Sequence, residues 1–119
     1  MSGAGSKARL DGWLLVRPEG DIDLYSVPAL RGTLLAGLSS GRHKILLDLS
    51  AVTFMDSSGF AVVMTAFKRV QAEGGELRVC GPGLAVRSSL RISGLDRLLP
   101  LFADVDAALA SAAESSGAS

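Results

Sequence analysis

Residues 44–70 read KILLDLSAVTFMDSSGFAVVMTAFKRV and contain the two clearest secondary-structure signals of the chain. Residues 45–49 form a nearly continuous apolar run, which is typical of a strand that is covered on both faces of a parallel sheet. Apolar residues then recur at the spacing of the buried face of a helix, at Phe60, Val63, Met64, Phe67 and Val70. Gly74-Gly75 is a signal for the end of that helix. This stretch therefore predicts a buried strand followed by a long amphipathic helix.

The rest of the chain alternates between the same two kinds of element. Strands are predicted at residues 13–16 and 77–80, with a second short strand at 20–23 and an edge strand at 98–102. Helices are predicted after Ser26, which can cap the segment with Leu30, Leu34 and Leu38, then at residues 82–92 and after Asp104. The last helix places Val105, Ala108, Leu109 and Ala112 on its inner face. This alternation indicates an α/β domain whose central strands run parallel.

Size and charge limit the classes of protein to consider. A chain of 119 residues fits one domain, which we expect at residues 9–113 between flexible tails at 1–8 and 114–119. Lys and Arg number 12, and so do Asp and Glu, which argues against direct nucleic-acid binding and against a polybasic membrane anchor. The sequence has no membrane-length apolar run, no secretory signal, and one cysteine, which excludes an internal disulfide. We therefore expect a cytoplasmic protein that does not bind membranes.

The segment Asp56-Ser57-Ser58-Gly59 connects the predicted buried strand to the long helix. Asp and Ser side chains accept hydrogen bonds from the free N–H groups at a helix start, so one interpretation is a helix N-cap and nothing more. The other interpretation is functional, because a turn after a strand lies at the carboxyl edge of the sheet, where open α/β folds bind ligands and partners. There the hydroxyl of Ser57 is exposed, and the helix N-terminus favours a negative charge added to it.

Catalytic and nucleotide-binding chemistry find no support in the residues. A nucleophilic Ser57 needs a base, and the only histidine is His43, which precedes residues 45–49 and so lies at the opposite end of that strand. Five residues of strand separate the two by about 16 Å. Gly81-Pro82-Gly83 lacks the third glycine of a dinucleotide loop, because Val86 stands in its place. We expect no catalytic residue and no cofactor.

Metal binding is not supported either. Asp21, Asp23 and Asp48 form no cluster with the spacing of a metal site. An ionised Asp48 in an apolar strand needs partners, so we expect it near the strand end, where it accepts backbone hydrogen bonds. Cys80 is predicted to be a small core residue.

Four segments, taken in order, resemble a known family: Gly20-Asp21-Ile22-Asp23, residues 45–49, residues 52–59 and Gly74-Gly75-Glu76-Leu77. Their order over about residues 9–113 resembles the anti-sigma factor antagonist family, the STAS domains. The resemblance implies a single STAS-type α/β domain with a mixed four- to five-stranded sheet, parallel central strands and about four packed helices. It also implies that the protein has no catalytic activity of its own.

The resemblance implies a function as well. Members of the family bind an anti-sigma factor that is also a serine kinase, and so free a sigma factor. The kinase phosphorylates the first hydroxyl after the motif's Asp, which ends binding, and a phosphatase reverses the modification. In this sequence that hydroxyl is Ser57, although Ser58 lies in the same turn and stays open as the acceptor. Asp23, Asp56, Ser58 and Gly59 match the rest of the partner-binding site.

The role of Gly59 and the function of the domain each have more than one interpretation. Gly59 is expected either to let a partner backbone approach closely or to fit the helix start without a side-chain clash. The same domain also occurs as a subunit of other signalling assemblies and of lipid transporters, which are the alternative functions.

Overall fold

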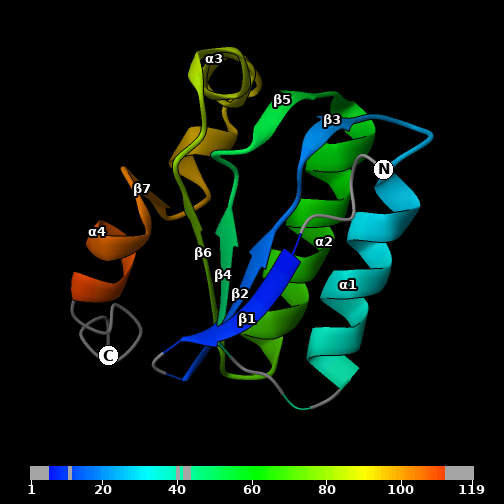
Figure 1. Cartoon of the computed structure of the whole chain (residues 1–119). Helices are drawn as coiled ribbons and strands as arrows, with labels where there is room; N and C mark the ends of the chain where they lie inside the picture. The colour runs from blue at the N-terminus through cyan, green and yellow to red at the C-terminus, as the bar shows by residue number, and fades with distance from the viewer. Residues whose placement is uncertain (1–5, 11, 40, 42–43, 112–119) are drawn as a thin grey trace.

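The computed structural model describes residues 6–10, 12–39, 41 and 44–111 (Figure 1). Its larger sheet has five strands in the order β1-β2-β4-β6-β7. They are β1 (Ser6–Leu10), β2 (Trp13–Arg17), β4 (Lys44–Asp48), β6 (Glu76–Cys80) and β7 (Leu101–Phe102). β1 is antiparallel to β2 and the other neighbours are parallel. The predicted α/β fold with parallel central strands is confirmed.

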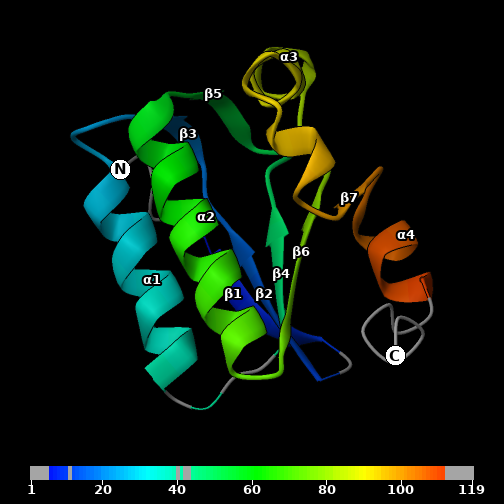
Figure 2. The same ribbon diagram turned by 180° about the vertical axis from the view of Figure 1, so that it is seen from behind.

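Helices cover both faces of this sheet, as the two opposite views show (Figures 1 and 2). α1 (Val27–Ser39) and α2 (Ser57–Ala72) lie on one face, and α4 (Val105–Ala110) lies on the other. Along β4, Ile45 and Leu47 belong to the core cluster under α1 and α2, whereas Leu46 packs with Trp13 and Ala108 in a second cluster. Burial from both sides explains why the sequence of β4 is apolar without alternation.

A second, two-stranded sheet pairs β3 (Gly20–Ile22) with β5 (Val52–Met55) in parallel. It lies beside α3 (Leu84–Ser93), at the end of the molecule where α2 begins (Figure 1). β3 confirms the predicted short strand. β5 was not predicted, because its two central residues, Thr53 and Phe54, are exposed and give neither an alternating nor a continuous apolar pattern. The segment before α2 therefore follows β5 rather than the central strand that the sequence analysis assumed.

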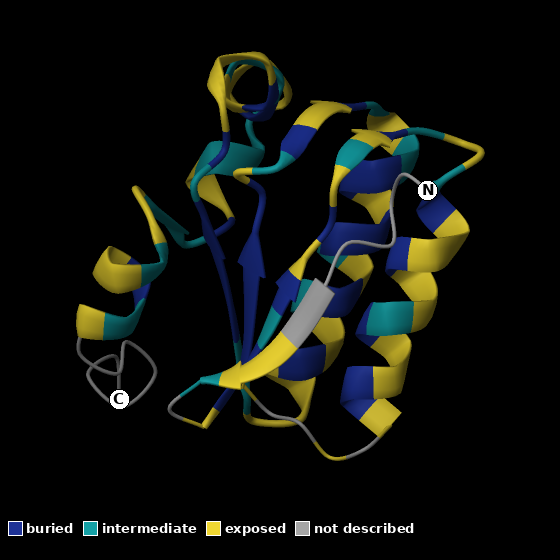
Figure 3. Cartoon of the chain, in the orientation of Figure 1, coloured by how far each residue is buried: buried dark blue, intermediate teal, exposed yellow. Residues whose placement is uncertain are grey.

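β1 was also missed, because residues 6–8 were assigned to an N-terminal tail. Ala8 pairs with Leu15 and Leu10 with Trp13 across the β1–β2 ladder. β1 is an edge strand with one neighbour, and backbone pairing rather than an apolar pattern defines it. In Figure 3 the part of β1 whose burial is described is mostly exposed, whereas the central strands are buried.

Several helix ends follow the predicted signals. Asp104 caps α4, because its Oδ1 accepts a hydrogen bond from the Ala107 N–H at 2.8 Å. Gly94 ends α3 with φ +80°, a conformation that side chains disfavour. The predicted edge strand at 98–102 is a strand only at Leu101–Phe102 and follows a short 3₁₀ helix, η1 (Leu95–Arg97). Ala112, the predicted tail at 114–119 and His43 lie outside the described residues.

Asp48 lies where the sequence analysis placed it, buried at the end of β4. One carboxylate oxygen accepts a hydrogen bond from the Ser50 N–H at 2.9 Å, and the other lies 3.1 Å from Nε of Arg17. The buried charge thus has both a backbone donor and a cation, which is what a carboxylate away from water requires.

Arg78 on β6 is a buried cation that the sequence analysis did not identify. Its guanidinium lies 4.8 Å from the centroid of the Trp13 ring and 5.4 Å from that of Phe102, and it pairs with Glu76 at 3.2 Å. It also donates a hydrogen bond to the Ala108 carbonyl of α4. Arg78 therefore fastens the last helix to the sheet through charge, ring stacking and a backbone contact.

Candidate functional site

Asp56 organises the start of α2. Its Oδ1 accepts hydrogen bonds from the Ser58 N–H at 2.9 Å, the Gly59 N–H at 3.4 Å and the Ser58 hydroxyl at 2.5 Å. The Ser58 hydroxyl, followed by the two backbone donors, lowers the pKa of Asp56 below its usual value, although desolvation acts in the opposite direction. Asp56 is therefore the N-cap of α2, and this capping role is compatible with a further role of the turn.

The cap leaves the two serines in different situations. Ser58 is half-buried and donates its hydroxyl proton to Asp56. Ser57, the first residue of α2, is exposed, and no hydrogen bond of its hydroxyl is found to any part of the chain that the structure describes. Of the two candidate acceptors, Ser57 thus offers the accessible hydroxyl, at the end of a helix that favours negative charge.

Gly59 is buried, and its missing side chain has a packing reason. A Cβ at this position would lie 2.6 Å from Cγ of Met55 and 2.9 Å from Cγ2 of Ile22. α2 can therefore approach β3 and β5 this closely only with glycine at residue 59. The geometry supports the second of the two roles expected for Gly59, a fit at the helix start without a clash.

Asp23 builds the loop that connects β3 to α1. Its Oδ1 accepts hydrogen bonds from the N–H groups of Tyr25 and Ser26, both at 3.0 Å. Ser26 directly precedes α1, but its hydroxyl does not cap the helix as predicted: it accepts from the Asp23 N–H at 2.9 Å and donates to the Asp21 carbonyl at 2.7 Å. The polar groups of the loop thus bond to one another, and the side chains of Leu24 and Tyr25 are 70% and 92% exposed.

Strand pairing brings this loop next to the start of α2. Ile22 of β3 is the register partner of Met55 of β5, and the Asp56 N–H donates to the Ile22 carbonyl at 3.1 Å. Asp23 and Asp56 therefore follow two adjacent, parallel strand ends, which are drawn side by side in Figure 1. The residues that the sequence analysis assigned to one site are brought together by the small sheet rather than by the large one.

Three exposed apolar side chains that were not predicted as site residues lie close to the paired ends of β3 and β5, after which Ser57 begins α2. Leu24, Tyr25 and Phe54 lie within three residues of the Ile22–Met55 pair, and Phe54 is 48% exposed. We call Leu24, Tyr25, Phe54 and Ser57 the Ser57 surface. The signal available in the sequence was the apolar pair Leu24-Tyr25 between Asp23 and Ser26, because turn positions are usually polar. Exposed apolar side chains that gather in one place mark interaction sites.

The remaining candidate residues have structural roles. The Thr53 hydroxyl donates to Oδ1 of Asp21 at 2.5 Å, which joins β5 to β3. Cys80 is buried, as predicted, and burial raises its pKa to about 12, with Asp48 and Asp104 adding to the shift. Within residues 6–10, 12–39, 41 and 44–111, no group of three His, Cys, Asp or Glu side chains can hold a metal ion. The helices of that part are too short or too polar to cross a membrane.

The sequence matches a known domain family and named relatives. The family model described as STAS domain matches residues 6–108. The chain is 32% identical over 92 residues to the anti-sigma F factor antagonist of Paenibacillus polymyxa, which covers 76% of this chain and 79% of that protein.

Two solved structures extend the comparison. The anti-sigma factor antagonist from Mycobacterium paratuberculosis is 29% identical, with a TM-score of 0.81 over 92% of this chain and 96% of that one. The Bacillus cell fate determinant SpoIIAA in its phosphorylated form is 21% identical, with a TM-score of 0.67 over 86% of this chain and 94% of that one. The second likeness concerns the fold alone.

Proposed function

This chain belongs to the STAS domain family, and from that premise we propose that it is an anti-sigma factor antagonist, which binds an anti-sigma factor and so releases a sigma factor. The Paenibacillus relative and the mycobacterial structure both bear that name. The observation that carries the proposal is the exposed hydroxyl of Ser57, directly after the capping Asp56 and next to the paired strand ends that bear exposed apolar side chains.

The Ser57 surface is the contact area in this proposal. Tyr25, 92% exposed, has the features of an anchor residue, because tyrosine buries a large area with little loss of conformational entropy. Asp23 contributes indirectly, since its hydrogen bonds shape the loop that holds Leu24 and Tyr25 outward. Asp56 and Gly59 act beneath the surface, where they fix the position of Ser57 at the helix start.

We infer further that the partner is a serine kinase that phosphorylates Ser57 and that a phosphatase restores the hydroxyl. The preference for Ser57 over Ser58 follows from accessibility, because the Ser58 hydroxyl is half-buried and already bonded to Asp56. A precedent for a modified form of this fold exists in the phosphorylated SpoIIAA structure.

Phosphorylation would end binding through charge. A phosphate adds about 1.5 to 2 negative charges at neutral pH, next to an Asp56 whose lowered pKa keeps it ionised. The phosphate must also lose water if it is buried beneath a partner, and its neighbours on the Ser57 surface are apolar. A hundredfold loss of affinity corresponds to about 2.7 kcal/mol, which one uncompensated charge in an interface readily supplies.

The test uses the purified chain with candidate anti-sigma kinases and ATP, followed by mass-spectrometric mapping of the phosphate. Wild type and Ser58→Ala should be phosphorylated at Ser57, and Ser57→Ala should not be phosphorylated. In binding assays, Ser57→Ala should retain the affinity of the unmodified chain, whereas Ser57→Asp should bind about 100-fold more weakly. A phosphate on Ser58, or wild-type affinity of Ser57→Asp, would contradict the proposed switch.

A further inference from the structure

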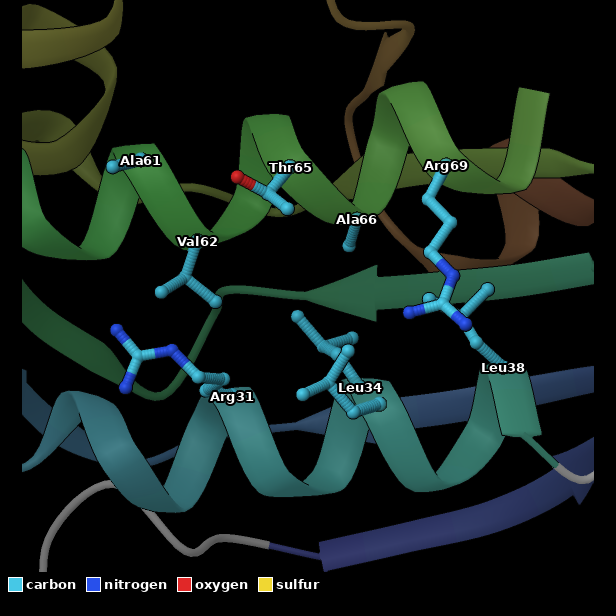
Figure 4. A pocket seen from close by; sticks show the side chains of 9 residues that line it. Arg31, Leu34, Leu38, Ala61, Val62, Thr65, Ala66 and Arg69 are labelled. Carbon is cyan, nitrogen blue, oxygen red and sulfur yellow. The ribbon is translucent and has the colours of Figure 1, made fainter. Parts of the chain in front are cut away.

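A groove of about 170 Å³ lies between α1 and α2 (Figure 4). Its floor is apolar and buried, with Leu34 and Leu38 from α1 and Val62 and Ala66 from α2. On the α2 side the rim consists of the exposed residues Ala61 and Thr65, which have short side chains, and of Arg69. The groove exists because small residues of α2 face the leucines of α1, so that the helices pack at the floor and leave space above it.

The size of the groove fits a small apolar group rather than isolated waters. One water needs only about 10–15 Å³ of such volume, and a dry cavity of about 150 Å³ in another protein takes up benzene. From Arg31 to Leu38, α1 advances seven residues, which corresponds to about 10 Å of length. An alkyl chain of about that length can therefore lie along the floor and bury its surface against the aliphatic side chains.

Two arginines lie over this apolar floor, one at each end of the groove and one from each helix. Arg31 extends from α1 towards Val62, and Arg69 extends from α2 towards Leu38 (Figure 4). None of the described residues that line the groove is acidic. Arg69 already pairs with Glu73 at 3.5 Å, whereas no ion pair of Arg31 is found among the residues that the structure describes. The groove therefore combines an apolar floor with a cation that is available to an anion.

We propose that the groove between α1 and α2 binds an aliphatic carboxylate, with the alkyl chain on the floor and the carboxylate at Arg31. A guanidinium presents its N–H donors in a planar fork that matches a carboxylate, so Arg31 can donate two parallel hydrogen bonds to the two carboxylate oxygens. Arg31 lies one helical turn after the start of α1, and Ala61 one turn after Ser57. The ligand would therefore sit beside the Ser57 surface without occupying it.

The test is an NMR titration of the full chain with octanoate, read from backbone amide shifts. Saturable shifts should appear at the amides of Arg31, Leu35, Ala61 and Thr65, which line the groove. Arg31→Gln should weaken the affinity at least tenfold, and Ala61→Phe, which fills the mouth from an exposed position, should weaken it by a similar factor. Arg91→Gln, an exposed arginine substitution on α3, is the matched control and should bind like wild type.

Acetate and octanol separate the two parts of the ligand, and both should bind at least tenfold more weakly than octanoate. The proposal is overturned if no saturable shifts appear at the lining residues, or if acetate or octanol binds as tightly as octanoate. Unchanged affinity of Arg31→Gln or Ala61→Phe overturns it as well. Both substituted side chains are exposed, so thermal melts should confirm that the variants keep the fold.

Discussion

The substitution Gly59→Ala tests how the start of α2 is seated on the small sheet. The added Cβ would meet Cγ of Met55 at 2.6 Å and Cγ2 of Ile22 at 2.9 Å, so at least one buried side chain must move. Inserting a methyl group into a packed core typically costs about 1–3 kcal/mol, and the better helix propensity of alanine returns at most about 1 kcal/mol. We expect a net loss of stability, with about 4–8 °C of melting temperature for each kcal/mol.

Gly32→Ala is the matched control, because Gly32 lies on the exposed side of α1 and a Cβ there meets nothing within 4 Å. It should gain about 0.5–1 kcal/mol from helix propensity alone. Urea denaturation followed by circular dichroism measures both variants. Equal stability of Gly59→Ala and Gly32→Ala would refute the packing argument. If Gly59→Ala instead lost affinity for the partner without losing stability, Gly59 would be a contact residue for the partner.

Three further predictions concern titration, thiol reactivity and the buried arginine. The pKa of Asp56 is lower in the folded than in the unfolded chain. The ionised carboxylate therefore contributes its full stabilisation above its ordinary pKa of about 4, and this contribution is lost as the pH falls through the folded-state pKa. Urea denaturation should show that Asp56→Asn loses less stability on acidification than wild type. Burial raises the pKa of Cys80 to about 12, so a thiol reagent at pH 8 should label it only as fast as the chain unfolds, and rapid labelling would contradict this. Arg78→Ala should cost about 3–5 kcal/mol in the same denaturation assay, because it leaves the mostly buried Glu76 without its cation. Adding Glu76→Gln should recover part of this loss. An unchanged denaturation midpoint for Arg78→Ala would contradict the role of Arg78 in holding α4 against the sheet.

Elements with a local signal could be predicted from the sequence. The apolar run of β4 and the helical periodicity of α2 each lie within one segment, and both elements are found where they were expected. β1 and β5 carry no such signal, because they are defined by the strand beside them. Because β5 precedes Asp56, the turn at the start of α2 follows the small sheet and not the large one. The residues of the turn itself lie at the start of α2, as expected.

The surroundings of the site depend on contacts between segments that are distant in sequence. That Leu24 and Tyr25 are exposed follows from the hydrogen bonds of Asp23 within its loop, and that this loop lies beside Ser57 follows from the pairing of Ile22 with Met55. The groove has the same origin, since Ala61 and Ala66 leave a space only when the leucines of α1 lie opposite. Sequence patterns indicate which face of a helix is buried, but not which residues meet across an interface.

Asp56 caps α2, whereas Ser57 carries the hydroxyl that a kinase would modify, so a phosphate need not disturb the cap. The cap uses the carboxylate of Asp56 and donors of Ser58 and Gly59, so none of its side-chain hydrogen bonds passes through the Ser57 hydroxyl. A modification of that hydroxyl can therefore leave the cap intact. The repulsion between the phosphate and Asp56 is opposed by the N-terminal dipole of α2, so the two effects on stability act in opposite directions. Within the proposed function, phosphorylation should therefore change the affinity for the partner far more than the stability of the fold, because only the partner must bring a surface against the new charge.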